Sequence, residues 1–329
     1  MNKKLMIVGI LFNSPFLKAQ DIPKEYFDLV KKGDSLYNIK QFEKSAKMYS
    51  SAFKVNKWKG LPNDRYNAAC SWAMANVPDS AFFNLERVAK MMGYNNYAHI
   101  IKDSDLIGLH NDKRWNPLIE LVKQNKEKAD ANLNKPLVAK LDSIHYDDQT
   151  YRYQAQEFQK KYGWDSKELK DVHAILRTKD SINLIQVTAI LDKYGWLGSD
   201  IIGDAGNNTL FLVIQHSDLK TQEKYLPMLK EAVKNGKASG VGLAMLEDRI
   251  EMRNGRKQIY GSQIGIDLIT KDYYVVALVD PENVDKRRAS VGLPTMEMYL
   301  TNWNLKWDLE QYKKDLPTLE AKLIDFISK

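Results

Sequence analysis

Cysteine is nearly absent from the chain, since Cys70 is the only one among 329 residues. A single thiol excludes an internal disulfide framework and any zinc site built on several cysteine ligands. The sequence has five scattered histidines and no His-Glu-x-x-His motif. We therefore expect no metal and no cofactor. We interpret Cys70 as a small hydrophobic residue that lies on a predicted helix and faces the protein core.

A strong charge of one sign is also lacking, because 49 lysines and arginines face 42 aspartates and glutamates. Removal of a leader containing Lys3, Lys4 and Lys18 would lower the net charge from +7 to +4. That balance is too mild to indicate nucleic-acid binding. Neither a Gly-x-Ser-x-Gly motif nor a phosphate-binding loop occurs, since residues 203–206 lack the required Lys-Ser/Thr. The sequence therefore names no nucleophile and no reaction.

Residues 1–20 have the order of a secretory signal peptide. Two lysines precede the mostly apolar run Leu5–Phe12, Pro15 follows it, and the segment ends in Ala19-Gln20. This ending resembles signal peptides of the Bacteroidetes. The run is shorter than the roughly 20 residues of a membrane-spanning helix. We predict a signal peptide of 19 or 20 residues, a periplasmic or secreted protein, and no transmembrane span after signal removal; the alternative is a buried first helix.

Residues 21–132 are predicted to form a domain of helical repeats. Gly33 falls where two helices would approach each other, and bulky residues follow it at helical spacing. Residues 65–89 show the same spacing, so the region resembles tetratricopeptide repeats. Ser45 replaces the consensus alanine of the second helix.

A degenerate third unit follows, and it looks like the closing segment of many bacterial repeat proteins. Its Asp112-x-x-Trp115 motif precedes a polar stretch, residues 123–135, where we place the domain boundary. Helical pairs of this kind need at least about three stacked units to bury a core. The stack would serve either as a surface for a protein or peptide partner or as a packing platform for the second domain.

Residues 136–329 are predicted to form a mostly helical domain with a small antiparallel β-hairpin. Pro136 suits the first turn of a long helix, and further helical patterns follow along the domain. The apolar period changes to two in residues 258–264 and 273–279, which predicts two paired strands. The expected fold class is therefore mainly α, with tetratricopeptide-like repeats followed by this domain.

Charged side chains interrupt the apolar stripe of the first helix in this second domain. Asp148 lies on the stripe, Gln149 stands beside it, and Arg152 lies one turn further on. Buried charge is costly unless it is paired. The two charged residues therefore form either a buried structural ion pair or the wall of a polar pocket.

Five short polar motifs follow one another along the second domain, and the first contains Asp148, Gln149 and Arg152. They are Asp-Gln-x-x-Arg at 148–152, Gln-His-x-Asp at 215–218, Asp-Arg at 248–249, Gln-x-Tyr-Gly-x-Gln at 258–263 and Val-Asp-x-Arg-Arg-x-x-x-Gly-Leu at 284–293. Together they resemble an uncharacterised bacterial family, a domain of unknown function, over about residues 136–300. Leu197 departs from the proline usual in that family. The family has no established activity, so the resemblance implies membership and no reaction.

These motifs supply our candidate site residues. The ligand-binding candidates are Gln149, Arg152, Gln215, His216, Asp248, Arg249, Gln258, Tyr260, Gln263, Asp285 and Arg288. His216 could act as an acid or base, with Asp148 or Asp248 as its partner, or it could be a core histidine bonded to a neighbour. Gln258 and Tyr260 share one face of the predicted strand, and a bulge at Gly261 would bring Gln263 to that face. This wall would form either a surface for a peptide or sugar or a satisfied polar network.

Two functions of different classes follow. The first is an exported envelope protein that acts as a protein or peptide interaction module, or a ligand-binding one, with a polar pocket in the second domain. The second is a hydrolase acting on a cell-wall or peptide substrate, in which His216 works with a carboxylate and opens onto a cleft. A purely structural or inhibitor-like role is also compatible with the sequence.

Overall fold

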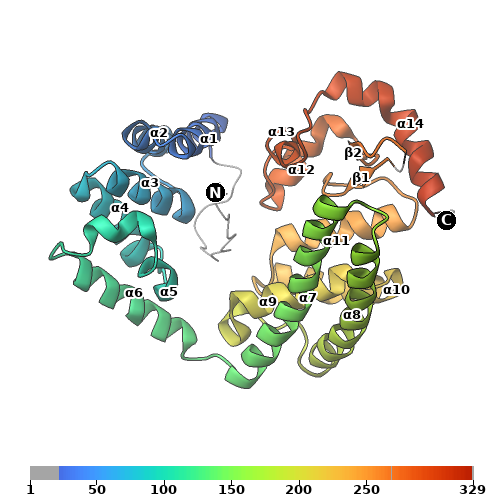
Figure 1. The fold of residues 1–329 in the computed structure, drawn as a ribbon, viewed down its shortest axis with the longest axis horizontal. Coiled ribbons are helices and arrows are strands. Elements are labelled where there is room, and N and C mark those ends of the chain that lie inside the picture. Colours follow the sequence, from blue (N-terminus) through green and yellow to red (C-terminus); the bar gives the residue numbers. More distant parts are fainter. Residues whose placement is uncertain (1–21, 268, 328–329) are drawn as a thin grey trace. The chain divides into compact units, whose positions relative to one another are not determined.

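The computed structural model describes residues 22–267 and 269–327, and the predicted signal peptide lies outside them. The described chain is mainly helical with one small two-stranded antiparallel sheet, so the predicted fold class is confirmed (Figure 1). The chain divides into two compact units between Asn132 and Leu133. None of the helices in the described ranges combines the length and the apolar character needed to cross a bilayer.

The first unit is built from helical hairpins with repeat-like packing. Its elements are α1 (Lys24–Asn38), α2 (Phe42–Val55), α3 (Pro62–Met74), α4 (Pro78–Met91), α5 (Tyr97–Ile100), the 3-10 helix η2 (Ser104–Leu109) and α6 (Trp115–Asp130). Helix α1 packs on α2, α2 on α3, and α3 on α4. Gly33 allows the first pair to approach closely, because a Cβ there would lie 3.1 Å from the Tyr49 ring. Apolar side chains of each hairpin are thereby buried against the next.

The second unit begins with two long helices and continues with shorter ones. Its helices are α7 (Lys135–Tyr162), α8 (Lys167–Tyr194), α9 (Ser199–His216), α10 (Leu219–Lys234), α11 (Gly240–Arg253), α12 (Val284–Ser290), α13 (Met296–Leu300) and α14 (Leu309–Ile327), with short 3-10 helices η3 (Pro281–Asn283) and η4 (Thr301–Trp303). Helix α9 packs on both α7 and α8, and α10 packs on α11. Leu141, Val187 and Leu210 belong to the core that these helices share.

The β-hairpin is shorter than predicted and its first strand is displaced. Strand β1 (Ile264–Ile266) pairs with β2 (Tyr273–Val275), whereas the sequence pattern had placed the strands at residues 258–264 and 273–279. Gln258 only forms an isolated bridge with Leu278. The prediction for the first strand was therefore wrong, because the Asp248 carboxylate binds backbone N–H groups within residues 259–262.

Candidate functional site

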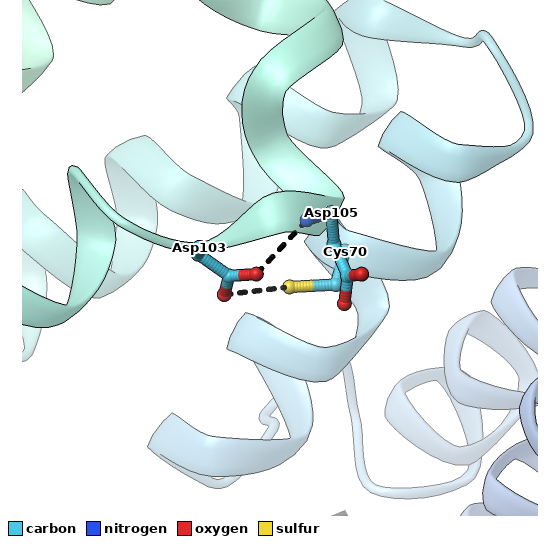
Figure 2. Close-up of side chains that lie close together, drawn as sticks. All are labelled: Cys70, Asp103 and Asp105. Carbon is cyan, nitrogen blue, oxygen red and sulfur yellow. Dashed lines mark hydrogen bonds between the residues drawn. The ribbon is translucent and has the colours of Figure 1, made fainter. Parts of the chain in front are cut away.

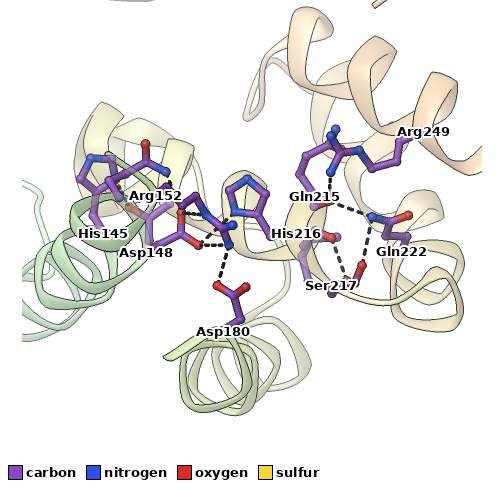
Figure 3. Close-up of polar contacts among 12 residues, drawn as sticks. His145, Asp148, Arg152, Asp180, Gln215, His216, Ser217, Gln222 and Arg249 are labelled. Atoms are coloured by element: carbon purple, nitrogen blue, oxygen red, sulfur yellow. Dashed lines mark hydrogen bonds and ion pairs between the residues drawn. The ribbon is translucent and has the colours of Figure 1, made fainter. Parts of the chain in front are cut away.

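A buried carboxylate on α7 is the centre of a polar cluster in the second unit. Asp148 is 1% exposed, and its Oδ1 lies 3.0 Å from Nδ1 of His216 at the end of α9 (Figure 3). Gln149 donates from Nε2 to Asp148 Oδ2 at 2.6 Å, and Arg152 donates from Nη2 to Oδ1 at 3.3 Å. The same Arg152 nitrogen lies 2.5 Å from Oδ1 of Asp180 on α8. Three helices therefore bring their polar side chains to one point.

The cluster favours the ionised form of Asp148. Burial raises the pKa of this carboxyl, but hydrogen bonding and charge attraction from His216 and then Arg152 outweigh it, and the pKa falls to about 2. The ionised Asp148 in turn orients the imidazole of His216 through their hydrogen bond. The two alternatives left by the sequence are thus not exclusive, because Asp148 is paired with Arg152 and also lines a pocket.

That pocket has a volume of about 190 Å³ and lies between α7, α8 and the C-terminal end of α9. It is lined by Asp148, Asp180, Ser181, Leu184, Val213, His216, Ser217 and Asp218. The His216 side chain is 19% exposed, whereas Asp148 beneath it is almost sealed. A ligand in the pocket would therefore meet the imidazole and several carboxylate or hydroxyl oxygens.

Side chains from α10 and α11 hold the C-terminal end of α9, which carries His216. The backbone oxygen of Gln215 accepts from Gln222 Nε2 at 2.8 Å and from Arg249 Nη1 at 3.0 Å. The backbone oxygen of Ser217 accepts from Arg253 Nη1 at 2.6 Å. The last carbonyls of a helix have no partner within it, and basic side chains stabilise them. These contacts fix the position of His216 against Asp148.

Asp248, the second predicted partner of His216, has a different role. Its Oδ1 accepts the backbone N–H groups of Ile259 and Tyr260 at 2.6 and 2.9 Å, and its Oδ2 accepts that of Ser262 at 2.8 Å. The carboxylate therefore folds residues 259–262 into a loop. Backbone donors that bind a side chain cannot also bind a neighbouring strand, which explains why the first predicted strand does not form there.

The glutamines and arginines of the later motifs support this loop. Gln258 donates from Nε2 to the backbone oxygens of Gln263 and Val276, and its Oε1 accepts from the Gln263 N–H. Gln263 Oε1 accepts from Arg249 Nε at 3.2 Å. Arg288 is fully buried and donates to the backbone oxygens of Tyr260 and Pro294. These residues therefore form a polar network under the loop, in which Nη2 of Arg288 is buried without a hydrogen-bond partner among the described residues.

The other two candidates also lie apart from the pocket. Asp285 accepts the backbone N–H of Met296 at 2.7 Å, which links α12 to α13. Burial, followed by the negative charge of Glu247, raises the pKa of Tyr260 to about 12. Neither residue lines the pocket beside His216.

Asp180 and Gln222 belong to the site but were not predicted. Asp180 lies in the segment Lys179-Asp180-Ser181 on α8, which reads as an ordinary solvated helix surface. Only the packing of α8 beside α7 brings it to Arg152. Gln222 lies within α10 and has no motif around it, although its complete burial on an amphipathic helix places it on the core stripe.

A separate group in the first unit contains Cys70, Asp103 and Asp105 (Figure 2). One ligand atom from each lies within 4.8 Å of the others, a spacing at which a metal ion could bind. The Cys70 thiol donates to Asp103 Oδ2 at 3.7 Å, and Tyr66 donates to the same oxygen at 2.9 Å. Burial, and then the two carboxylates, raise the pKa of the Cys70 thiol, so its protonated form is favoured. The group is therefore a hydrogen-bonded core network rather than a thiolate site.

Comparison with known proteins identifies the second unit. Residues 135–310, more than half of the chain, match the model of a family described as a family of unknown function, DUF6624. The predicted resemblance to an uncharacterised domain family over about residues 136–300 is thus confirmed. No curated protein and no solved structure matches the chain.

Proposed function

The chain belongs to the DUF6624 family, whose function is unknown, and from the geometry of its site we propose that the second unit is a ligand-binding module. The observation that carries this proposal is the position of Asp148, a buried carboxylate shared by His216 and Arg152 at the edge of a pocket of about 190 Å³. Pockets lined by apolar walls and a few convergent polar groups are typical of small-molecule sites. Leu184 and Val213 provide apolar walls, and His216 with Asp148 provides the polar end.

The hydroxyl groups of the pocket favour binding over covalent chemistry. Ser181 donates from Oγ to the backbone oxygen of Arg177 at 2.9 Å, and Ser217 donates from Oγ to that of Ile214 at 2.7 Å. A serine nucleophile needs a base that accepts its proton. Both hydroxyls instead donate to backbone carbonyls of α8 and α9, so His216 has no serine among the lining residues to activate.

A hydrolase is the second candidate, and the His216–Asp148 pair is the observation that favours it. A carboxylate 3.0 Å from Nδ1 orients the imidazole and leaves Nε2 to accept a proton. His216 would then activate a water molecule rather than a side-chain nucleophile. Asp148 would be its partner in this mechanism, because Asp248 is bonded to the 259–262 loop.

We further propose that the first unit contains tetratricopeptide-like repeats that bind a protein or peptide partner. Its stacked hairpins and the close approach at Gly33 support this. The order of residues 1–20 supports export through a signal peptide to the periplasm or beyond the cell. The complete protein would then be an envelope protein with a scaffold and a ligand-binding domain.

Ligand-induced thermal stabilisation of residues 21–329 tests the proposal. The panel contains muropeptides, short peptides, sugars and divalent metal ions, and the variants are Arg152→Ala and His216→Ala. A ligand that binds only the folded state raises the melting temperature. We expect a compound that stabilises the native protein and loses its effect in both folded variants. A panel without effect, together with strong destabilisation by both substitutions, would mean that the cluster is only a structural ion network.

A further inference from the structure

Arg249 is a partly buried guanidinium with only neutral hydrogen-bond acceptors around it. Its Nε donates to Gln263 Oε1 at 3.2 Å and its Nη1 to the backbone oxygen of Gln215 at 3.0 Å. Within residues 22–267 and 269–327, no carboxylate oxygen lies within 4.0 Å of this side chain. A charge withdrawn from water without a counter-ion is costly, so this arrangement requires an explanation.

Neighbouring cations increase that cost. Burial, followed by the guanidiniums of Arg253 and Arg152, lowers the pKa of Arg249 to about 10. Arg253 lies one turn further along α11 and also bonds a backbone oxygen, that of Ser217. Arg152 approaches from α7 and is the only one of the three with a carboxylate at ion-pair distance among the described residues. Asp148 and Asp180 offset the charge of Arg152, and Asp218 acts on Arg253, so among these three guanidiniums Arg249 is the one that lacks an acidic neighbour within the described residues.

Capping of α9 explains only part of this cluster. Basic side chains near the C-terminus of a helix stabilise its free carbonyls, and Nη1 of Arg249 and of Arg253 does so in this protein. Nη2 of Arg249 donates to no described residue, yet it is not among the buried groups that lack a partner. This nitrogen therefore remains accessible. In Figure 3, Arg152 approaches the His216 ring from the left, and Arg249 reaches Gln215 on the right.

We propose that Arg249 binds an anionic group, a carboxylate or a phosphate, at the C-terminal end of α9, on a part of the ligand that extends beyond the residues lining the His216 pocket. The inference rests on the proposed function, because it specifies the charge of the ligand bound at this site. Guanidinium donors form strong charge-assisted hydrogen bonds with both kinds of anion. An anion at Nη2 would supply the missing counter-charge.

The test measures the melting temperature of residues 21–329 with inorganic phosphate, with acetate, or with chloride at the same ionic strength. The variants are Arg249→Gln, which keeps a donor for the Gln215 carbonyl, and Arg249→Lys, which also keeps the charge. Arg287→Gln is the matched control, since Arg287 also bonds backbone oxygens but has Asp280 as an acidic partner at 3.2 Å. The phosphate and acetate arms distinguish the two kinds of anion.

We expect phosphate or acetate to raise the melting temperature saturably in the native protein and in Arg287→Gln. In Arg249→Gln the midpoint concentration should rise about tenfold or more, because a charge-assisted bond is lost, and Arg249→Lys should be intermediate. If the glutamine variant does not fold, butanedione modification of the native protein replaces it, and phosphate or acetate should slow modification of Arg249 more than that of Arg287.

Equal anion effects in Arg249→Gln and Arg287→Gln would overturn the inference, as would no effect in the native protein. Arg249 would then serve only as a cap for α9. These results leave the proposed function standing if a panel compound still depends on Arg152 and His216. If no panel compound and no anion binds, both proposals fail together.

Discussion

Asp148 shows how a single buried charge acquires its partners. The side chain is almost fully buried, and its carboxylate is bound by Arg152 of α7 and by His216 of α9. Its position on the apolar stripe of α7 was visible in the sequence, and so was Arg152 one turn further on. The sequence left open whether His216 pairs with Asp148 or with Asp248. His216 and Asp148 are 68 residues apart along the chain, so no local pattern indicates their contact.

Replacing Asp148 with asparagine should destabilise the second unit by about 2 kcal/mol at neutral pH. The folded pKa of about 2 lies below the ordinary 3.8, so the carboxylate stabilises the fold above pH 3.8 and loses this effect as the pH falls towards 2. Urea unfolding at pH 6 and pH 2.5 measures the difference between native protein and variant. It should shrink at the lower pH, whereas Asp142→Asn on the exposed face of α7 should have little effect at either pH. A difference that does not change with pH would show that Asp148 has the same pKa in the folded and unfolded states, so that the cluster does not lower it.

Asp248→Ala should cost at least about 3 kcal/mol, because three backbone N–H groups lose a charged acceptor in a buried loop. Denaturant unfolding followed by far-ultraviolet circular dichroism measures this loss. The exposed Asp272 in the hairpin loop provides the control, and Asp272→Ala should change stability by less than about 0.5 kcal/mol. A similar, small effect for both substitutions would mean that the Asp248 carboxylate does not hold the 259–262 loop and does not displace the first strand.

Among the elements, the long helices and the presence of a small antiparallel hairpin could be predicted, whereas the bounds of its first strand could not. Proline at position 136, apolar periodicity and glycine after each helix mark α7 and α8 in the sequence. The alternation in residues 258–264 is equally clear, but the carboxylate of Asp248 binds the amides there. A side chain ten or more residues away thus overrides a local pattern. The same reasoning explains why Asp180 was missed, since only helix packing gives it a partner.

Gly195 ends α8 in a backbone conformation that is nearly restricted to glycine. Its φ of 69° and ψ of −169° match those of Gly163 after α7, at 87° and 171°, and both follow a Lys-Tyr pair. Gly195→Ala should therefore destabilise the second unit by about 1–3 kcal/mol, although an added Cβ meets no neighbour there. Thermal unfolding checks this, with Gly108→Ala as the control at an open position without positive φ. A neutral Gly195→Ala variant would mean that the turn relaxes freely.

At the scale of the whole molecule, the sequence predicts export, and this prediction depends on the signal-like order of residues 1–20. Val8→Asp interrupts the apolar run of the predicted signal peptide and should retain the protein as a cytoplasmic precursor, whereas Asn13→Asp beyond the run should be exported. Cell fractionation and mass spectrometry of the product in a Gram-negative host measure this. The exported form should begin at residue 20 or 21. Retention of both variants, or export of both with an intact N-terminus, would exclude a cleaved signal.

The most direct test of the proposed site is nuclear magnetic resonance of the His216 imidazole in residues 21–329, labelled with nitrogen-15. The muropeptide, peptide and sugar panel is titrated while the ring resonances are followed. We expect one compound to shift the His216 signals saturably, at the same midpoint as its thermal effect, because the ring borders the pocket of about 190 Å³. Saturable binding that leaves the His216 ring unchanged would place the ligand elsewhere and reject this pocket as the functional site.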